Sequence, residues 1–301
     1  MSLRSNSVSS SINYEIVEMK ILNHEKLSEF VEAINSNKKQ GLFVVSDFDR
    51  TLTKAYVDGR YVTSLMGILR NSSYLDEDYK IKGQKLFNYY SPKVEGENAL
   101  PVSQREALVQ QWWSKAYELL KGKGLRKKYI EEIVKHPDLQ LREGVVDFFN
   151  WTEKNTIPIF IMSAGGLGTL SIELFLKLKK QLRENIHIVS NELFWSEEGV
   201  FLGVKEPMVH MFNKTGRLIS DNPKANAFLK GRRYAFILGD SIGDSRMADG
   251  ISELSLKVYI SGSGKENVLE AEEEDLSQYF DIILEPNESY VEIMRILGTS
   301  I

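Results

Sequence analysis

Short, unbroken apolar runs recur along the chain, and each of them ends at small or polar residues. Runs of this length without polar alternation are typical of strands that are buried on both faces, as in a parallel sheet. The runs are Leu42–Val45, Ile157–Met162, Ile186–Val189, Tyr234–Leu238, Val258–Ile260 and Ile282–Leu284. We predict that each of these runs forms a strand.

Stretches with helical spacing of apolar residues alternate with the predicted strands. The clearest are Lys26–Asn37, Glu143–Lys154, Thr169–Leu182 and Ser289–Leu297. This alternation predicts an α/β fold with a doubly wound, Rossmann-like parallel sheet. Ligands bind beyond the carboxyl ends of the strands in such sheets, and the polar residues that follow the apolar runs lie there.

The interval from 58 to 136 breaks the alternation of strands and helices. It contains no convincing strand, and its helical periodicity is clearest in Gln104–Lys121 and Leu125–Lys135. We predict a helical-bundle cap domain at 58–136, inserted into a catalytic core formed by 18–57 and 137–301. A plain extension of the core is the alternative. The polar, Ser-rich residues 1–17 are expected to form a disordered tail.

Composition and charge exclude several classes of function. The 301 residues contain no cysteine, which excludes disulfides, thiolate metal sites and a cysteine nucleophile. The formal net charge of -4 gives no general attraction to nucleic acid or to an anionic membrane. No apolar stretch approaches the roughly 20 residues of a membrane span, and the first residues lack the apolar core of a signal peptide. A cytoplasmic protein is therefore expected.

Two aspartates follow the first predicted strand directly. Asp47 and Asp49 can point the same way in an extended segment, because side-chain direction alternates. Two close carboxylates repel each other unless one is protonated or a cation lies between them. A metal-bound Asp47 could then act as a nucleophile, and a protonated Asp49 could donate to a leaving oxygen. A solvated turn is the alternative for this pair alone.

A second acidic pair follows the strand at Tyr234–Leu238. Asp240 and Asp244 flank Ser241-Ile242-Gly243 at the start of a predicted helix. Oxygen ligands from separate strand ends suit a hard cation such as Mg²⁺. A capped helix start would explain one of these acids but not both.

A third feature is Ser163-Ala164-Gly165-Gly166, where a hydroxyl and small residues would let backbone N–H groups approach a phosphate. A carboxylate that attacks a phosphate also needs a nearby cation. Lys214 and Lys224 are the candidates, and their spacing alone does not choose between them.

These features in this order resemble the haloacid dehalogenase superfamily of phosphatases. Asp47-Phe48-Asp49-Arg50-Thr51 is similar to its Asp-x-Asp-x-Thr signature, and the other features are similar to its remaining three motifs. Further segments resemble the cytosolic pyrimidine 5′-nucleotidases, the type III enzymes and their 7-methylguanosine-phosphate-specific relatives. These segments are Ser46–Thr53, Gln111–Tyr117, Leu141–Phe149, Ile157–Gly166, Val189–Phe194, Val209–Lys214 and Leu238–Gly250.

The resemblance implies a role for each matching residue. Asp47 would be the nucleophile and a magnesium ligand, and Asp49 would be the general acid and base that also binds the metal through its carbonyl. Asp240 would complete the protein's magnesium ligands. Thr51 would support the site, and Ser163 and Ala164 would hold the phosphate. Lys214, in preference to Lys224, would supply the positive charge. Asp244 would support Asp240.

The resemblance also implies that a glutamate of the cap reads the base. Glu95 matches that position without gaps, and Glu97 is the rival. Trp112 and Trp113 could stack on a base, although aromatic residues at helical spacing also form cores. The chain departs from the family at two positions: Ala116 replaces a serine that contacts substrate, and Ala55 stands where an aromatic residue is expected, with Tyr56 as its possible replacement.

The expected function is hydrolysis of UMP and CMP by a magnesium-dependent 5′-nucleotidase, through an aspartyl-phosphate intermediate. Alternatives are a phosphatase for another small monoester (7-methylguanosine monophosphate, phosphoserine or a sugar phosphate), a nucleoside phosphotransferase, and a binding module without activity. The expected partner is a small-molecule nucleoside monophosphate, with no nucleic acid and no membrane. A monomer is expected.

Overall fold

The computed structural model describes residues 19–36, 39–94, 100–261, 276–286 and 288–298. The predicted tail at 1–17 and the two candidate base-reading residues, Glu95 and Glu97, lie outside these ranges.

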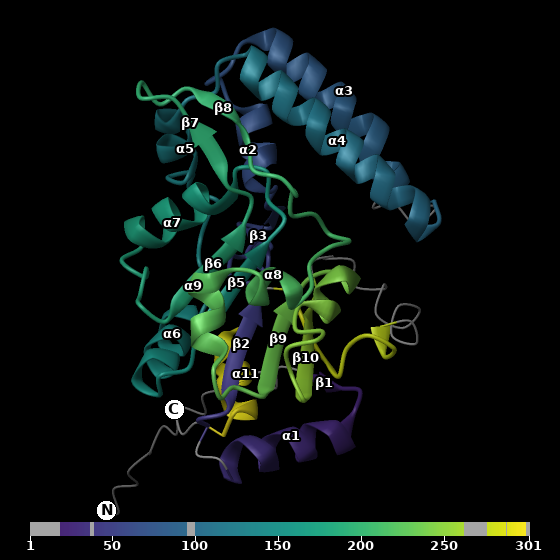
Figure 1. Ribbon diagram of the computed structural model, residues 1–301, viewed down its shortest axis with the longest axis vertical. Helices are drawn as coiled ribbons and strands as arrows, with labels where there is room; N and C mark the ends of the chain where they lie inside the picture. The colour runs from purple at the N-terminus through teal and green to yellow at the C-terminus, as the bar shows by residue number, and fades with distance from the viewer. Residues whose placement is uncertain (1–18, 37–38, 95–99, 262–275, 287, 299–301) are drawn as a thin grey trace, which may run out of the picture.

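A seven-stranded sheet forms the centre of the molecule, in the order β1-β11-β10-β9-β2-β5-β6 (Figure 1). The strands are β1 (Lys20–Ile21), β2 (Leu42–Ser46), β5 (Ile159–Ser163), β6 (Ile186–Ser190), β9 (Tyr234–Gly239), β10 (Leu254–Ile260) and β11 (Ile282–Leu284). All neighbours are parallel except β1, which runs antiparallel to β11. The predicted parallel α/β sheet and all six predicted strands are confirmed.

The central strand β2 shows why the apolar runs have no polar alternation. Val44 packs into a large core cluster on one face of the sheet, whereas Phe43 and Val45 pack into a second cluster on the other face. Side chains of a strand point alternately to the two faces, so both sets must be apolar when both faces are covered.

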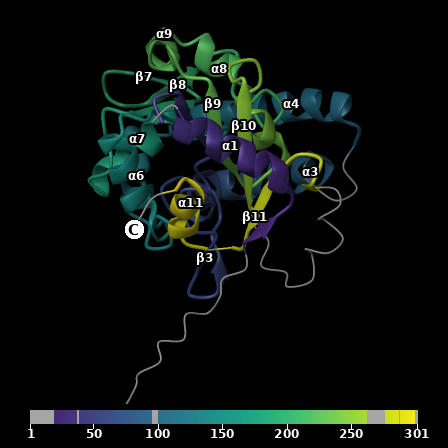
Figure 2. The ribbon, with the colours of Figure 1, turned by 90° about the horizontal axis from the view of Figure 1, so that it is seen from below.

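Helices cover both faces of the sheet (Figure 2). The larger cluster contains residues of α1 (His24–Ser36), α6 (Val145–Lys154), α7 (Gly168–Leu178) and α11 (Tyr290–Ile296). The smaller cluster contains residues of α8 (Arg217–Ser220) and α9 (Pro223–Asn226), which η1 (Ala227–Leu229) follows, and it borders η2 (Ile242–Arg246). The sheet is therefore doubly wound.

The predicted helical interval lies between β2 and β5 in the chain and above the carboxyl ends of the strands (Figure 1). Its helices are α2 (Leu65–Asn71), α3 (Glu77–Val94), α4 (Val102–Gly122) and α5 (Lys127–Ile133). The neighbours α3 and α4 pack along each other. A small hairpin, β3 (Tyr56–Val57) and β4 (Arg60–Tyr61), leads into these helices, so the interval does contain one short strand that the sequence analysis did not predict.

A second unpredicted hairpin joins the cap helices from the far part of the chain. It consists of β7 (Leu193–Trp195) and β8 (Phe201–Val204), and β8 packs on α4. The N–H of Phe201 donates to the carbonyl of Leu125 at 2.8 Å, and the N–H of Lys127 donates to the carbonyl of Gly199 at 2.9 Å. The cap layer therefore includes residues beyond 136, and the predicted domain boundaries stay a prediction.

The predicted helices agree with the observed ones except at some ends. The prediction extended one helix to Leu182, but α7 ends at Leu178. Lys180 adopts a φ of 57°, in the left-handed region, where a right-handed helix cannot continue. The error reflects a backbone conformation that apolar periodicity does not encode.

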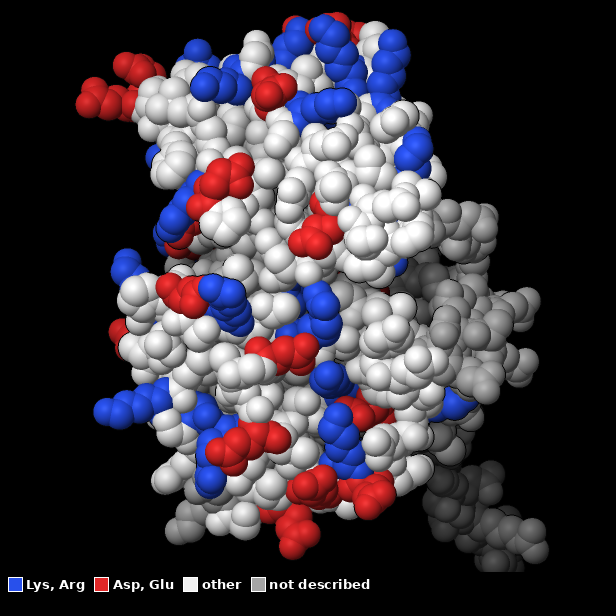
Figure 3. Space-filling model, turned by 45° about the vertical axis from the view of Figure 1, so that its right-hand side comes forward, with Lys and Arg blue, Asp and Glu red and all other residues white. Residues whose placement is uncertain are grey.

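The surface carries both signs of charge. Acidic and basic side chains are interspersed on the face in Figure 3, which fits the small formal net charge of -4. Among the described helices, none combines the length and the apolar character that crossing a bilayer requires.

Candidate active site

Asp47 stands at the carboxyl end of β2, in the middle of the sheet. Its N–H donates to the carbonyl of Leu238 in β9 at 2.9 Å, which extends the strand pairing to the aspartate itself. The side chain is buried, with 7% of the residue exposed. The central position of β2 between β9 and β5 therefore holds this carboxylate at the switch point of the sheet.

A buried arginine holds the turn after Asp47 in place. The guanidinium of Arg142 donates to the carbonyl of Arg50 at 2.5 Å and to that of Thr51 at 3.1 Å. The hydroxyl of Tyr290 donates to the same Thr51 carbonyl at 3.2 Å. Arg50 itself adopts a φ of 60°, which turns the chain sharply. These contacts fix the segment that carries Asp47 and Asp49.

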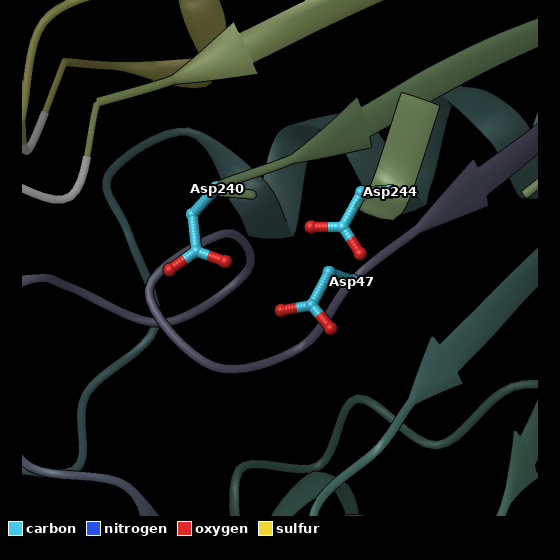
Figure 4. A group of neighbouring side chains, drawn as sticks. All are labelled: Asp47, Asp240 and Asp244. Atoms are coloured by element: carbon cyan, nitrogen blue, oxygen red, sulfur yellow. The ribbon is translucent and has the colours of Figure 1, made fainter. Parts of the chain in front are cut away.

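The second acidic pair lies at the end of β9. The carboxylate of Asp244 accepts from the N–H of Ser241 at 3.0 Å and from its hydroxyl at 2.8 Å, which forms a capping box at the start of η2. Asp47, Asp240 and Asp244 offer carboxylate oxygens that all lie within 4.8 Å of one another. Figure 4 shows the three carboxylates close together, with Asp47 after β2, Asp240 after β9 and Asp244 on η2.

Two cations neutralise part of this acidic group. The ammonium of Lys214 donates to Asp47 at 2.6 Å and also to Asp244, and the lysine is buried. The guanidinium of Arg50 donates to Asp240 at 2.8 Å. Lys214 is therefore the lysine that lies in the site, whereas Lys224 is exposed on α9 and does not line the cavity.

Burial and mutual repulsion perturb the acids. Burial raises the pKa of Asp47 well above its usual value, and the carboxylates of Asp244, Asp240 and Asp49 add to that effect, while Lys214 opposes it. Burial also raises the pKa of Asp49. For Lys214, burial favours the neutral amine, but Asp244 and Asp47 outweigh it and hold its pKa above the ordinary value.

The donor set fits a divalent cation. Among the described residues that line this end of the cavity, four carboxylates (Asp47, Asp49, Asp240 and Asp244) face two cations (Lys214 and Arg50), which leaves a formal charge of -2 when all are ionised. Clustered carboxylate oxygens are the ligands that hard cations such as Mg²⁺ take in proteins. The carbonyl ligand expected from Asp49 stays a prediction.

Ser163 and the small residues after it form a loop beside the acids. The hydroxyl of Ser163 accepts from the N–H of Gly165 at 3.0 Å, and a Cβ at Gly165 would lie 3.7 Å from Oδ2 of Asp49. A Cβ at Gly166 would lie 2.4 Å from Cζ3 of Trp113 and 2.8 Å from Cγ of Met66. The loop thus touches the acids on one side and the cap on the other.

A cavity of about 370 Å³ joins the acidic end to the cap. It is lined by Asp47, Asp49, Ser163, Ala164, Lys214, Asp240 and Asp244 from the core, and by Trp112, Trp113 and Ala116 from α4. Thr51 is buried behind the acids. Ala55 is buried, and Tyr56 packs on Tyr61 with ring centroids 5.4 Å apart. The structure therefore brings together the candidate catalytic residues and places both tryptophans at the same cavity.

Several residues that line the cavity could not be predicted from the sequence. Tyr61 on β4, Met66 and Arg70 on α2, and Phe87 on α3 all line the cavity. Tyr61 supplies an aromatic ring near the position where Ala55 lacks one. No motif marks these residues, since they reach the cavity only through the packing of the cap. The apolar stretch at Leu65–Leu69 was the available signal for α2.

Comparisons with known proteins agree with this architecture. A model of the family described as pyrimidine 5′-nucleotidase (UMPH-1) matches residues 50–300. The 7-methylguanosine phosphate-specific 5′-nucleotidase of Mus musculus is 34% identical over 264 residues, which cover 88% of this chain and 86% of that protein. The human protein of the same name has the same identity and coverage.

Solved structures show the same fold. A crystal structure of cytosolic 5′-nucleotidase IIIB bound to cytidine has a TM-score of 0.82 and 27% identity, and covers 93% of this chain and 92% of that one. A phosphoserine phosphatase, solved as a phospho-aspartyl intermediate analogue, has a TM-score of 0.51 and 17% identity over 85% of this chain and 97% of that one. The chain therefore belongs to the pyrimidine 5′-nucleotidase family, a family of phosphoric monoester hydrolases within the haloacid dehalogenase superfamily.

Proposed function

We propose that the protein hydrolyses pyrimidine nucleoside 5′-monophosphates, CMP and UMP, to nucleoside and phosphate through an aspartyl-phosphate on Asp47. The observation that carries this proposal is the convergence of Asp47, Asp240 and Asp244 within 4.8 Å at one end of a cavity. The other end of that cavity has aromatic walls that suit a planar base. A cytoplasmic location is part of the proposal.

In the first step, a carboxylate oxygen of Asp47 attacks phosphorus, and the bond from phosphorus to the 5′-oxygen breaks. Asp49 donates its proton to that leaving oxygen, and its raised pKa favours the protonated form that this role needs. In the second step, Asp49 takes a proton from a water molecule that attacks the phosphorus, and Asp47 is released as a carboxylate.

The remaining residues hold the phosphate and offset its charge. Lys214 lies against Asp47 and would offset the negative charge that develops as two anions approach. Ser163 and Ala164 would bind phosphate oxygens from the loop after β5. Asp47, Asp49 and Asp240 would hold Mg²⁺, with Asp244 and Thr51 in support. When bound, the ion supplies Lewis-acid stabilisation of the phosphoryl oxygens.

A second candidate substrate is 7-methylguanosine monophosphate. The observation in its favour is the 34% identity to proteins named as specific for that phosphate. Its base is also planar and could lie against Trp112 or Trp113, which line the cavity.

The test is phosphate release from a panel of monoesters, measured with Mg²⁺ and with a chelator. The panel contains CMP, UMP, 7-methylguanosine monophosphate, phosphoserine and a sugar phosphate, with added nucleosides to detect phosphoryl transfer. We expect Mg²⁺-dependent release from CMP and UMP and none in an Asp47→Asn variant. A preference for phosphoserine or a sugar phosphate over every nucleotide would contradict the proposal.

A further inference from the structure

Arg70, in the last turn of α2, lines the cap end of the cavity. Its guanidinium carbon lies 4.2 Å from the ring centroid of Phe87. Within the described ranges, Tyr79 and no carboxylate acts electrostatically on Arg70, and its Nε is buried without a hydrogen-bond acceptor. A buried donor without an acceptor is unfavourable, so a ligand atom that accepts a hydrogen bond from Arg70 would be stabilising.

The packing around Arg70 holds its side chain in place. A Cβ at Gly83 of α3 would lie 3.6 Å from both Cγ and Cδ of Arg70, so the backbone of α3 passes close beside the arginine stem. The Phe87 ring supports the flat face of the guanidinium, an arrangement that suits arginine better than lysine. The arginine is thus positioned before any substrate binds.

The charges that line the cavity are divided between its two ends. The four lining acids (Asp47, Asp49, Asp240 and Asp244) lie at the strand ends, where Lys214 and Arg50 pair with them. Among the described lining residues, Arg70 is the one cation at the cap end, beside Phe87, Trp112 and Leu119. A base that lies against the aromatic residues would find a guanidinium donor and no described acid.

We propose that Arg70 is a specificity-determining residue that donates a hydrogen bond to a carbonyl oxygen of a neutral nucleobase. This inference rests on the proposed function and deepens it. The O2 oxygen of cytosine or uracil is an acceptor of the required kind. A 7-methylated guanine carries a positive charge, and two like charges repel each other. Arg70 therefore favours pyrimidine monophosphates over 7-methylguanosine monophosphate.

The experiment compares kcat/KM for CMP, 7-methylguanosine monophosphate and p-nitrophenyl phosphate, a substrate without a base. Arg70→Met removes the donors and the charge at similar length, and should lower kcat/KM for CMP about 10- to 100-fold. The same variant should raise kcat/KM for 7-methylguanosine monophosphate and leave p-nitrophenyl phosphate unchanged. Arg70→Lys, which keeps the charge, should restore part of the activity on CMP and should keep kcat/KM for the methylated nucleotide as low as in the wild-type protein. The control is Lys85→Met, which removes an exposed cation of α3 outside the cavity lining.

Three outcomes would count against the inference. Unchanged kcat/KM for CMP in Arg70→Met would overturn it, and so would an equal loss on all three substrates, which would mark a structural role. If the wild-type protein turned over p-nitrophenyl phosphate but no nucleotide, the proposed function would fail first, and the role of Arg70 with it.

Discussion

At the scale of single residues, the site depends on Lys214. Its buried ammonium donates to Asp47 at 2.6 Å and to Asp244, so one cation compensates two buried carboxylates. Removing one partner of a buried ion pair leaves a charge that neither water nor protein satisfies.

Lys214→Met should therefore destabilise the protein as well as inactivate it. In metal-free buffer we expect the free energy of unfolding to fall by roughly 3–5 kcal/mol, because two buried carboxylates lose their counter-charge. Urea unfolding and phosphate release measure the two effects. Lys224→Met is the matched control, since that lysine is exposed, and it should change neither quantity. A Lys214 variant with wild-type stability would show that the ion pairs contribute little.

The sequence predicts some of these residues and misses others for a physical reason. Asp47, Asp49, Asp240 and Ser163 could be found because each follows an apolar run that forms a buried strand. The spacing of Lys214 and Lys224 along the chain does not show which of them lies in the site, because the loop that carries Lys214 reaches the acids only in the folded chain.

At the scale of secondary-structure elements, the loop after β5 connects the acidic end of the cavity to the cap. Trp113 of α4 and Met66 of α2 lie so close to Gly166 that any side chain there would collide with them. Closely packed contacts of this kind tolerate little added volume.

Gly166→Ala should therefore displace the cap from the loop. We expect a loss of about 1–3 kcal/mol in the free energy of unfolding, which is typical of overpacking, together with a lower kcat/KM. Gly203→Ala on β8 is the control, since a Cβ there meets nothing within 4 Å. If both alanine variants behaved alike in urea unfolding and in turnover, the close contact between loop and cap would not matter.

His187 on β6 should make the free energy of unfolding depend on pH. Its ring centroid lies 3.8 Å from that of Phe228 and 5.5 Å from that of Phe160, and its Nε2 has no hydrogen-bond partner among the described residues. Burial lowers the pKa of His187. Below the unfolded pKa of about 6.5 the unfolded chain binds more protons than the folded one, so stability falls as the pH falls.

His187→Phe should remove this acid sensitivity. Between about pH 7.5 and about pH 5.5, the variant should lose less stability than the wild-type protein, because no proton binds at this position. Urea unfolding at both pH values measures the difference. His24→Gln, at an exposed histidine of α1, is the comparison. Parallel pH profiles for the wild-type protein and His187→Phe would contradict the lowered pKa of this half-buried histidine.

Element type was predictable where the apolar pattern was strong, as in the six parallel strands. The hairpins β3-β4 and β7-β8 were missed because their strands have two to four residues, too few for a period to show. The packing of β8 on α4 and the hydrogen bond from Lys127 to Gly199 are contacts between distant parts of the chain. A single sequence does not encode such a contact as a local pattern.

At the scale of the whole molecule, the fold concentrates uncompensated negative charge at one point. The strand order places β2 between β9 and β5, so acids from two neighbouring strand ends must meet. When all four carboxylates are ionised, Lys214 and Arg50 leave a formal charge of -2, which opposes folding unless a cation binds.

Binding of Mg²⁺ should therefore stabilise the entire chain. A ligand that binds only the folded state adds about 2.7 kcal/mol at roughly 100 times its Kd. We expect Tm to rise with added Mg²⁺ and to fall with a chelator, and the rise should be lost in Asp240→Asn. Asp249→Asn, an exposed acid near η2, should retain it. A Tm that does not respond to Mg²⁺ would count against the metal site.

The central claim is that Asp47 bonds to phosphorus, and trapping that bond tests it most directly. The wild-type protein is mixed with CMP and Mg²⁺, quenched with acid within one turnover, and its peptides are mapped by mass spectrometry. The account predicts a phosphoryl group on Asp47. A phosphoryl group on another residue, or active turnover with an unmodified Asp47 at every time point, would contradict it.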